Sequence, residues 1–319
     1  MELNTKTIID VVKTLTNDNH LINTFKNCFY DTKDKAVKYI DDETFLITGD
    51  IPAMWLRDSS AQVMHYLPFA KEEEISRLIK GLIKRQMRMI LVDPYANAFK
   101  ETEDSYGEWD NVVVTNKHSK LVWERKFELD SLCYPLFLTC KYYEYTNDLS
   151  IFNDLFFKAF DKILETVHIE QNHEELSEYF FGYTFPNNQT IECHQNKVNP
   201  NNYGLVWCGF RPSDDLCEYH YHIPDNMFLV SSLIKLKDIF ENKLNNKHYA
   251  TICGELADSI RKGIEKYGIQ EIEGFGKIYV SETDCNGKFT TNDDANIPSL
   301  LSIPYLEYPY IDKEIYENT

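Results

Sequence analysis

The sequence predicts a single all-α domain that spans residues 1–319. Apolar residues recur at helical spacing in most segments, and long polar loops separate these segments. No repeat, low-complexity tract or proline-rich linker divides the chain. With 43% apolar residues, a chain of 319 residues can build one sizeable core. We therefore expect helices around a shared core, with the functional loops gathered at one end.

Helical periodicity locates the elements of the first half. Two helices open the chain, the first with Ile8, Val12 and Leu15 on one face. Residues 43–52 are predicted to be extended or a loop, and helices are predicted at 58–67, 72–92, 122–145 and 149–169. Pro135 is expected to kink the helix at 122–145. Residues 93–120 lack a sustained period, which predicts a long loop with a short hairpin.

The second half begins with a polar, irregular segment at 173–202, which is predicted to be a loop. Residues 203–229 follow, and the chain is organised around this stretch. Helices are predicted at 225–240 and 247–266, and the alternating, glycine-flanked segment 275–290 predicts a hairpin. The last residues begin a further helix or turn.

Charge and composition exclude several classes of partner. The net charge of −18 disfavours nucleic acid and anionic membrane surfaces, because both select basic faces. Neither a charged-then-apolar leader nor an apolar run of about 20 residues is present, so a cytoplasmic location is expected. The eight cysteines form no CxxC pair and lie mostly in apolar runs, which favours buried, reduced thiols.

Cofactor and metal signatures are missing from the sequence. There is no phosphate-binding glycine loop, dinucleotide fingerprint or nucleophile elbow. His220 and His222 lie near several carboxylates, but histidines two residues apart share a face only on a strand, and no third ligand follows at metal spacing. We expect no cofactor and no metal.

The central stretch offers the first candidate catalytic residues, Asp214 and Asp215. Ser213 has the character of a helix N-cap, which would place both carboxylates in a first helical turn. Simple capping explains such residues. The aromatic residues around them, Trp207 among them, favour a second interpretation, in which a carboxylic acid beside sugar-binding rings acts as a general acid.

A second group of candidates lies in the segment GDIPAMWLRDSS, which contains Asp50, Trp55, Arg57 and Asp58. Arg57 and Asp58 could form an ordinary surface ion pair. Alternatively, an arginine–aspartate pair at a helix start can hold two sugar hydroxyls through charge-assisted hydrogen bonds. The residues alone leave both interpretations open.

Two further charged runs have ordinary structural explanations. Trp123, Glu124 and Arg125 open a run that continues with carboxylates and is typical of a solvated helical face. Another run contains the residues of an ordinary Asx-rich turn before a proline: Asp293, Asp294 and Asn296.

Taken together, six ordered blocks resemble the metal-independent exo-α-1,6-mannosidases of glycoside hydrolase family 125. The blocks cover nearly the whole chain, at residues 48–63 (TGDIPAMWLRDSSAQV), 93–99 (DPYANAF), 122–135 (VWERKFELDSLCYP), 209–215 (GFRPSDD), 223–228 (IPDNMF) and 293–306 (DDANIPSLLSIPYL). The resemblance implies an (α/α)6 barrel with its active site in a cavity at one end. It implies inverting release of a terminal, non-reducing, α-1,6-linked mannose from mannose-containing oligosaccharides, without a metal.

The resemblance also implies roles for the candidate residues. One of Asp214 and Asp215, with Asp214 preferred, would be the general acid. The remaining candidates would line the mannose pocket: Asp50, Trp55, Arg57, Asp58, Trp123, Glu124, Arg125, Trp207, Arg211, Asp293, Asp294 and Asn296. An inverting glycosidase also needs a second carboxylate, roughly 6.5–9.5 Å from the first, to activate water.

Two departures from the family qualify the expected activity. Residues 183–203 differ from the sequence that family members usually have in this segment, so the rim of the site is expected to differ there. Family members continue past residue 310, and their general base is a glutamate in that later part. We therefore expect a barrel incomplete at its C-terminal helices and a chain without its base. It would be an incomplete mannosidase that is inactive or nearly so, a non-catalytic mannoside-binding remnant, or one half of a split enzyme completed by a separately encoded C-terminal segment.

Overall fold

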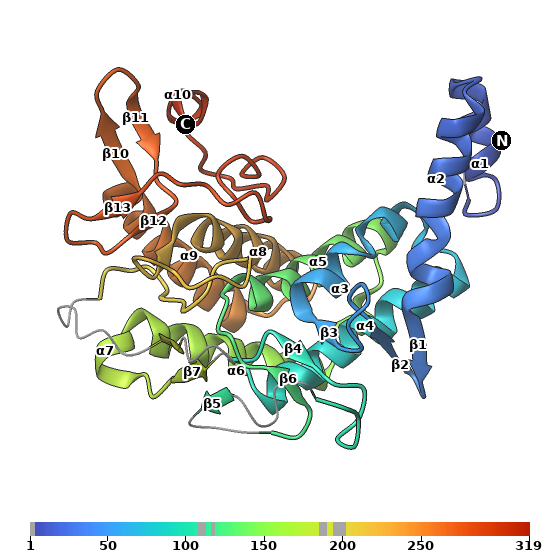
Figure 1. Cartoon of the computed structure of the whole chain (residues 1–319), viewed down its shortest axis with the longest axis horizontal. Coiled ribbons are helices and arrows are strands. Elements are labelled where there is room, and N and C mark those ends of the chain that lie inside the picture. The colour runs from blue at the N-terminus through green and yellow to red at the C-terminus, as the bar shows by residue number, and fades with distance from the viewer. Residues whose placement is uncertain (1–3, 108–112, 116–118, 185–189, 194–201) are drawn as a thin grey trace.

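The computed structural model describes residues 4–107, 113–115, 119–184, 190–193 and 202–319. Helices form the body of the molecule, and the strands form only small sheets of two or three members (Figure 1). The helices are α1 (Ile8–Leu15), α2 (Asn19–Asp31), α3 (Leu56–Ala61), α4 (Glu73–Val92), α5 (Asp130–Thr146), α6 (Asp154–Gln171), α7 (His173–Leu176), α8 (Ile223–Asn242), α9 (Lys247–Tyr267) and α10 (Lys313–Asn318). The prediction of an all-α fold class is therefore confirmed, whereas the number of barrel helices and the incompleteness of the barrel stay predictions.

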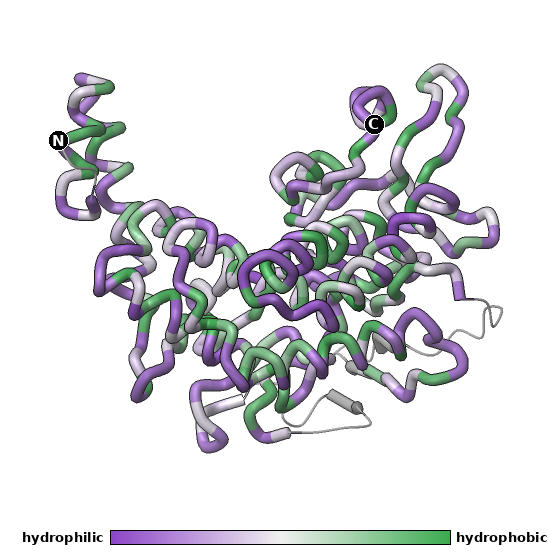
Figure 2. The backbone as a smooth tube through the Cα atoms, turned by 180° about the vertical axis from the view of Figure 1, so that it is seen from behind, coloured by the Kyte–Doolittle hydropathy of each residue, from purple (hydrophilic) through white to green (hydrophobic). Residues whose placement is uncertain are grey.

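The core forms where the long helices pack together. Helix α8 packs against α5 and α9, and α4 packs against α6 and α5. Helices α5 and α8 are buried nearly all round, so neither shows a strong amphipathic pattern, whereas α4 buries one face. Figure 2 shows the apolar segments along these packed helices and polar segments at the outer turns.

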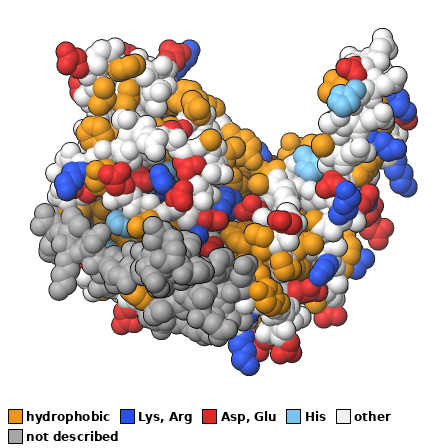
Figure 3. All heavy atoms as spheres, in the orientation of Figure 1, with side chains coloured by type: hydrophobic (Ala, Val, Ile, Leu, Met, Phe, Trp, Pro, Cys, Tyr) orange, Lys and Arg blue, Asp and Glu red, His pale blue; other side chains and the backbone are white. Residues whose placement is uncertain are grey.

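The first two helices are confirmed, and they form an arm that projects from the body (Figure 1). Helix α1 buries no residue, and Leu15 and Leu21 are exposed. The C-terminal strands β10 (Ile269–Ile272) and β11 (Gly276–Tyr279) and helix α10 project on the other side (Figure 1). A hollow with apolar atoms on its surface lies between the two projections (Figure 3).

Short antiparallel sheets hold the loops together. Strand β1 (Val37–Ile40) pairs with β2 (Glu43–Leu46), and β10 (Ile269–Ile272) pairs with β11 (Gly276–Tyr279). Three sheets have three strands each: β3 (Met54–Trp55), β4 (Ala98–Phe99) and β6 (Val122–Glu124); β5 (Val113–Thr115), β7 (Phe181–Thr184) and β8 (Thr190–Cys193); and β9 (Tyr221–His222), β12 (Glu282–Thr283) and β13 (Phe289–Thr290). The first of the three-stranded sheets positions the site.

The single helix predicted at 122–145 is wrong in its first part. Residues Val122–Glu124 form strand β6, which pairs with β4, and helix α5 begins only at Asp130. The charged run between them is not a solvated helical face, because Glu124, Arg125 and Glu128 are buried. A three-residue strand is defined by its partner, and local periodicity cannot reveal that partner.

The helix start predicted at Ser213 is also wrong. Residues around it form a tight loop, in which the Arg211 N–H donates to the Asp215 carbonyl at 2.8 Å and Phe210 pairs with Leu216. Asp214 adopts a left-handed conformation with φ of 65°, which aspartate tolerates better than most residues. The next helix, α8, starts at Ile223.

Smaller differences concern element boundaries. The helix predicted from residue 58 to 67 ends at Ala61 and continues as the 3-10 helix η2 (Met64–Phe69), which contains Pro68. The helix predicted from residue 149 begins at Asp154, after the 3-10 turn η3 (Leu149–Ile151). A π-helical turn, η1 (Thr32–Ala36), extends α2.

The predicted loops contain more regular structure than expected. Two hairpins, β10–β11 and β12–β13, replace the single one predicted at 275–290. Helix α7 and strands β7 and β8 lie within the loop predicted at 173–202. The segment 183–203, where the rim is predicted to differ, and the loop predicted at 93–120 lie partly outside the described residues.

Candidate functional site

Arg57 lies at the centre of a cluster of carboxylates. Strand β3 ends at Trp55 and helix α3 begins one residue later, which turns the Arg57 side chain toward the start of α5. Its Nη1 atom lies 2.7 Å from Glu128 Oε2 and 3.2 Å from Asp130 Oδ2. Both carboxylates are fully buried, so these pairs are largely shielded from water.

The tight loop of residues 211–215 brings a third carboxylate to the same guanidinium. Arg57 Nη2 lies 3.1 Å from Asp214 Oδ1, and Arg57 Nε lies 3.6 Å from Asp58 Oδ2. The Asp214 side chain is 33% exposed, so it faces both the buried cluster and solvent. The planar, multi-donor shape of arginine suits this arrangement better than lysine would.

Asn97 links the same carboxylates from the opposite side. Its Nδ2 atom lies 2.9 Å from Glu124 Oε2, 3.3 Å from Glu128 Oε1 and 3.5 Å from Asp214 Oδ1. Its Oδ1 atom accepts the backbone N–H of Lys126 at 3.2 Å. Strand pairing between β4 and β6 therefore fixes an amide at the point where three carboxylates converge.

The cluster holds more acidic groups than cations. Arg57 and Lys126 face a larger set of carboxylates: Asp58, Glu124, Glu128, Asp130 and Asp214. Burial and like-charge neighbours both favour the protonated form of a carboxyl group. Burial raises the pKa of Glu128 well above its usual range and the pKa of Asp130 to about 7, and it also raises the pKa values of Glu124 and Asp58.

Asp214 behaves differently from its neighbours. Burial acts to raise its pKa, but a hydrogen bond with the Glu128 carboxyl group and the charges of Arg57 and Lys126 outweigh that effect, and the pKa of Asp214 is lowered. Neighbouring carboxyl groups whose pKa values are pushed apart are typical of acid–base sites.

The structure separates the two candidate acids. Asp214 points into the cluster, whereas the Asp215 side chain is 70% exposed. Asp215 accepts from Ser213 Oγ at 3.3 Å and lies 3.8 Å from Arg211 Nη2. Of the two, only Asp214 touches Arg57 and Asn97 among the described contacts.

Two tryptophans form an apolar wall beside the carboxylates. Trp55 and Trp123 pack with Ala53 and Ala98 in a small cluster separate from the main core, on strands β3, β4 and β6. The Nε1 atom of Trp55 is buried without a hydrogen-bond partner in the described structure. Flat aromatic faces beside charged groups are the surfaces on which sugar rings pack.

A second loop reaches the loop that carries Asp214. Asp294 is hydrogen-bonded to Ser213; burial opposes the ionised form, but this bond and those from Asn296 lower the pKa of Asp294. Arg211 Nε lies 3.7 Å from Glu282 Oε1, which ties the loop to strand β12. Arg211, Asp294 and Asn296 therefore lie at the edge of the cluster.

Other predicted site residues serve the framework. Arg125 Nε lies 2.7 Å from the buried Asp93 Oδ2, and its guanidinium packs over the rings of Tyr95 and Tyr179 at 5.3 Å from each centroid. Asp293 Oδ1 accepts the Leu300 N–H at 2.8 Å.

Two more predicted residues lie apart from the carboxylate cluster. Trp207 is buried between His173 and His220, with ring centroids 3.7 and 4.9 Å away. Asp50 is exposed in a turn between Thr48 and Ile51.

Sequence reasoning missed several members of the cluster. Asn97 lies inside the block DPYANAF, and Lys126, Glu128 and Asp130 follow the tryptophan of the block VWERKFELDS. Their presence within family-like blocks was the available signal. The assumption that residues 122–145 form one exposed helix concealed it, because that helix would place these side chains on a solvated face.

The two histidines considered for metal binding have different partners and do not converge on a common point. His222 Nδ1 lies 2.9 Å from Asp225 Oδ1, and His220 Nδ1 lies 3.1 Å from the Cys208 carbonyl oxygen. Within the described ranges, no group of three or more His, Cys, Asp or Glu side chains is arranged to hold a metal ion.

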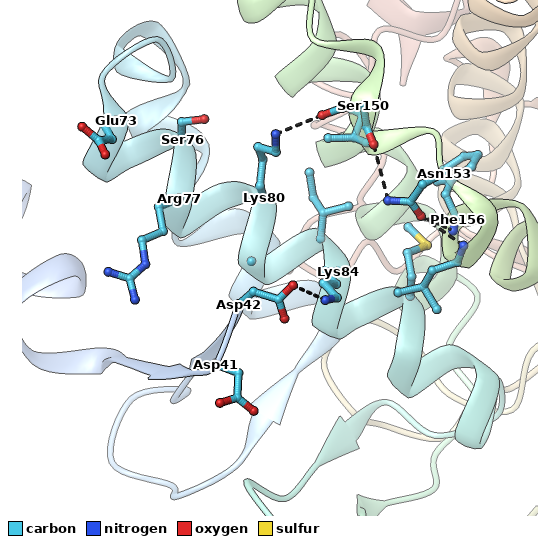
Figure 4. Close-up of a pocket in the computed structure, with 15 residues that line it drawn as sticks. Asp41, Asp42, Glu73, Ser76, Arg77, Lys80, Lys84, Ser150, Asn153 and Phe156 are labelled. Carbon is cyan, nitrogen blue, oxygen red and sulfur yellow. Dashed lines mark hydrogen bonds and ion pairs between the residues drawn. The ribbon is translucent and has the colours of Figure 1, made fainter.

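One cavity of the described structure lies away from this cluster. It has a volume of about 620 Å³ and lies between the β1–β2 turn, α4 and the start of α6. Lys84 pairs with Asp42 there, and Lys80 bonds to Ser150 at 2.9 Å (Figure 4). None of the predicted site residues lines it. Since none of the family-like blocks contributes to this cavity, we place the candidate active site at the carboxylate cluster.

The helical body and the buried carboxylates beside tryptophans have the character of a glycoside hydrolase. A sequence model described as metal-independent alpha-mannosidase (GH125) matches residues 18–319. The chain therefore belongs to this family.

Two relatives support this assignment. The meiotically up-regulated gene 157 protein of Schizosaccharomyces pombe is 35% identical over 334 residues, which cover 98% of this chain and 65% of the relative. A solved Streptococcus pneumoniae structure, from a study of metal-independent alpha mannosidases, is a non-productive substrate complex with alpha-1,6-mannobiose. It matches with a TM-score of 0.88 at 37% identity, over 98% of this chain and 74% of that chain. The present chain thus spans about two thirds to three quarters of the length of these relatives.

Within the described residues, no helix combines the length and apolar character that a membrane span requires.

Proposed function

We propose that this chain is an exo-acting α-mannosidase that releases terminal, non-reducing, α-1,6-linked mannose with inversion. The observation that carries the proposal is the contact of Asp214, which is 33% exposed, with Arg57 and Asn97 in a largely buried carboxylate cluster, in a chain of the GH125 family. The similar S. pneumoniae protein, whose structure contains alpha-1,6-mannobiose, supports the choice of ligand.

The residues around Asp214 take distinct roles in this proposal. Asp214 is the general acid that protonates the leaving glycosidic oxygen, because it is the most exposed of the three carboxyl groups that Asn97 links, Glu124, Glu128 and Asp214. Asp58 and Glu124 hold sugar hydroxyls, and Arg57 fixes the carboxylates. Trp55 and Trp123, which are only 6% and 4% exposed, form the apolar wall of the sugar site. No cofactor or metal takes part.

We further propose that residues 1–319 act as one catalytic domain and that its helices follow an (α/α)6 barrel. The packing of α4 against α6 and of α5 against α8 supports one continuous helical body, since the buried residues of these helices form a single main cluster.

A second candidate function is mannoside binding without hydrolysis. One observation favours it: Arg57, Lys126 and Glu128 hold Asp214 in its ionised form, whereas a general acid must be protonated when substrate is bound. A sugar that covers Asp214 would remove water from it, which favours protonation. The two functions therefore differ in what happens after the sugar binds.

The deciding experiment is hydrolysis of α-1,6-mannobiose by the purified 319-residue chain, with the released anomer followed by NMR. Initial release of β-mannose would support an inverting mannosidase, whereas initial α-mannose would contradict inversion. Matched controls are α-1,2- and α-1,3-mannobiose, which we expect to be cleaved far more slowly. Binding of α-1,6-mannobiose without release would favour the binding function.

Variants of the loop test the acid. Asp214→Asn should abolish hydrolysis and retain binding, whereas Asp215→Asn, on the exposed side of the same loop, should keep most of the activity. The reverse result would assign the acid to Asp215. If the chain binds without hydrolysis, recovery of activity on adding a separate polypeptide that covers the remaining part of the relatives would indicate a split enzyme.

A further inference from the structure

Glu128 and Asp214 share the same two donors. Arg57 contacts Glu128 through Nη1 at 2.7 Å and Asp214 through Nη2 at 3.1 Å. The single Nδ2 atom of Asn97 lies 3.3 Å from Glu128 Oε1 and 3.5 Å from Asp214 Oδ1. This arrangement holds the two carboxyl groups together, and they are hydrogen-bonded to each other. A carboxyl group donates a hydrogen bond to a carboxylate only when it is protonated, so a single proton shared within this pair stabilises the arrangement.

The charges that face Glu128 come from several elements. Arg57 comes from α3, Asp130 from the start of α5, Asp214 from the 211–215 loop, and Lys126 from the segment after β6. The neutral donors are Asn97, which also bonds the buried carboxyl group of Glu124, and the Ser131 hydroxyl, which lies 3.2 Å from Glu128 Oε2. One guanidinium contacts four carboxyl groups, since Asp58 lies 3.6 Å from Arg57 Nε as well, so at least one of the four is favoured in its neutral form.

Burial decides which group keeps the proton. The Glu128 side chain is fully buried, whereas Asp214 is 33% exposed and gains stabilisation of its charge from water. The pKa of Glu128 is raised by burial well above its usual range, and that of Asp214 is lowered. Burial raises the pKa of Asp130 to about 7, so Asp130 is mostly ionised in mildly alkaline solution. Glu128 is then the neutral member of the group.

We propose that Glu128 stores the proton that Asp214 delivers to the leaving group. This inference rests on the proposed function of Asp214 as general acid. When a sugar covers Asp214, the proton passes from the Glu128 carboxyl group to the Asp214 carboxylate, which leaves Glu128 ionised beside Arg57. Asp214 then gives the proton to the glycosidic oxygen as the C–O bond breaks, while a water molecule bonds to the anomeric carbon and releases one of its protons to solvent. Solvent returns one proton to Glu128 through Asp214 after the products leave.

Infrared difference spectroscopy of the protein without substrate tests the stored proton directly. A protonated carboxyl group has a C=O stretch that a carboxylate lacks. At pH 9, where Asp130 is ionised, we expect such a band in the unmodified protein and its loss in Glu128→Gln. Asp130→Asn and Asp215→Asn should keep the band, and Asp214→Asn should shift it because the hydrogen-bond partner changes. A band that survives in Glu128→Gln, or that is absent from the unmodified protein, would overturn the proposal.

The readout does not depend on turnover, so it separates this inference from the proposed function. Should Glu128→Gln fail to fold, deuterium-induced band shifts in the unmodified protein, combined with ¹³C labelling of glutamate carboxyl groups, identify a protonated glutamate instead. A protonated carboxyl band without ¹³C shift would assign the proton to an aspartate and contradict the proposal.

Kinetics give a second test if the chain hydrolyses α-1,6-mannobiose. Glu128→Gln should lower kcat by about 100-fold, with a smaller change in KM, because a general acid contributes on that scale. Its pH optimum should move to lower pH, since Asp214 must then take its proton from solvent. A uniform loss of activity without a shift of the pH profile would indicate a purely structural role for Glu128.

Discussion

Arg57 Nη2 and Asp214 Oδ1 lie 3.1 Å apart although 157 positions separate these residues in the chain. This contact connects helix α3 to the 211–215 loop, and the same guanidinium holds Glu128 and Asp130. Arg57 therefore determines both where Asp214 lies and how the charge of the cluster is balanced.

Removal of this charge should destabilise the protein strongly. In Arg57→Gln, buried carboxylates lose their cation, and we expect the free energy of unfolding at pH 8 to fall by about 3–5 kcal/mol. The loss should be smaller at pH 5, where the carboxyl groups can take up protons. Urea unfolding at both pH values measures the effect.

A matched control for Arg57→Gln exists on the surface of α9. Arg261 pairs with Asp258 and Glu265, and all three side chains are substantially exposed. Arg261→Gln should cost less than about 1 kcal/mol, because exposed pairs contribute little. Equal losses in both variants would contradict the central role of Arg57.

Asp130 should make stability depend on pH. Its pKa is raised to about 7 in the folded protein from 3.8, so between these values the folded state binds more protons than the unfolded state. The contribution of Asp130 to stability is therefore present at low pH and is lost as pH rises through about 7.

Asp130→Asn should remove this dependence, because asparagine stays neutral. We expect the Tm difference between the variant and the unmodified protein to move in favour of the variant as pH rises from 5 to 8. A constant difference across this range would show that Asp130 titrates alike in the folded and unfolded chains.

Gly204 should be intolerant of a side chain. It has φ of +80°, and an added Cβ would lie 2.6 Å from the backbone oxygen of Ser259 on α9. Gly204→Ala should therefore combine backbone strain with a clash and lower the free energy of unfolding by about 2–4 kcal/mol.

A substitution at Gly274 distinguishes backbone strain from steric clash as causes of the lower free energy of unfolding. Its φ is +83°, but no atom lies within 4 Å of an added Cβ. Gly274→Ala should show only the backbone strain, about 1 kcal/mol. Thermal unfolding of both variants compares them, and equal destabilisation would show that the contact with Ser259 relaxes freely.

The cysteines should differ widely in reactivity. Cys28 is exposed, whereas burial raises the pKa values of the Cys133 and Cys217 thiols well above their usual range and that of Cys253 to about 12. Since the thiolate is the reactive form, iodoacetamide should label Cys28 quickly and these buried cysteines only in denaturant. Peptide mass mapping measures the extent of labelling at each cysteine. Rapid labelling of Cys217 in the native protein would contradict the burial of this side chain, which follows the 211–215 loop.

The sequence by itself determined the helical class, the long helices and the family. Helix α4 and helices α8 and α9 were found because their apolar residues recur at helical spacing or fill long apolar runs, which are local properties. The family blocks also pointed to Arg57 and Asp214 and to the tryptophan wall.

Only the tertiary structure decided how these residues act. Pairing of β4 with β6 turned the charged run after Trp123 inward and brought Asn97, Glu128 and Asp214 together. The left-handed conformation of Asp214 and the exposure of Asp215 likewise depend on the closed 211–215 loop. Burial, charge balance and proton affinity arise from contacts between distant segments, so no local pattern in the sequence could have specified them.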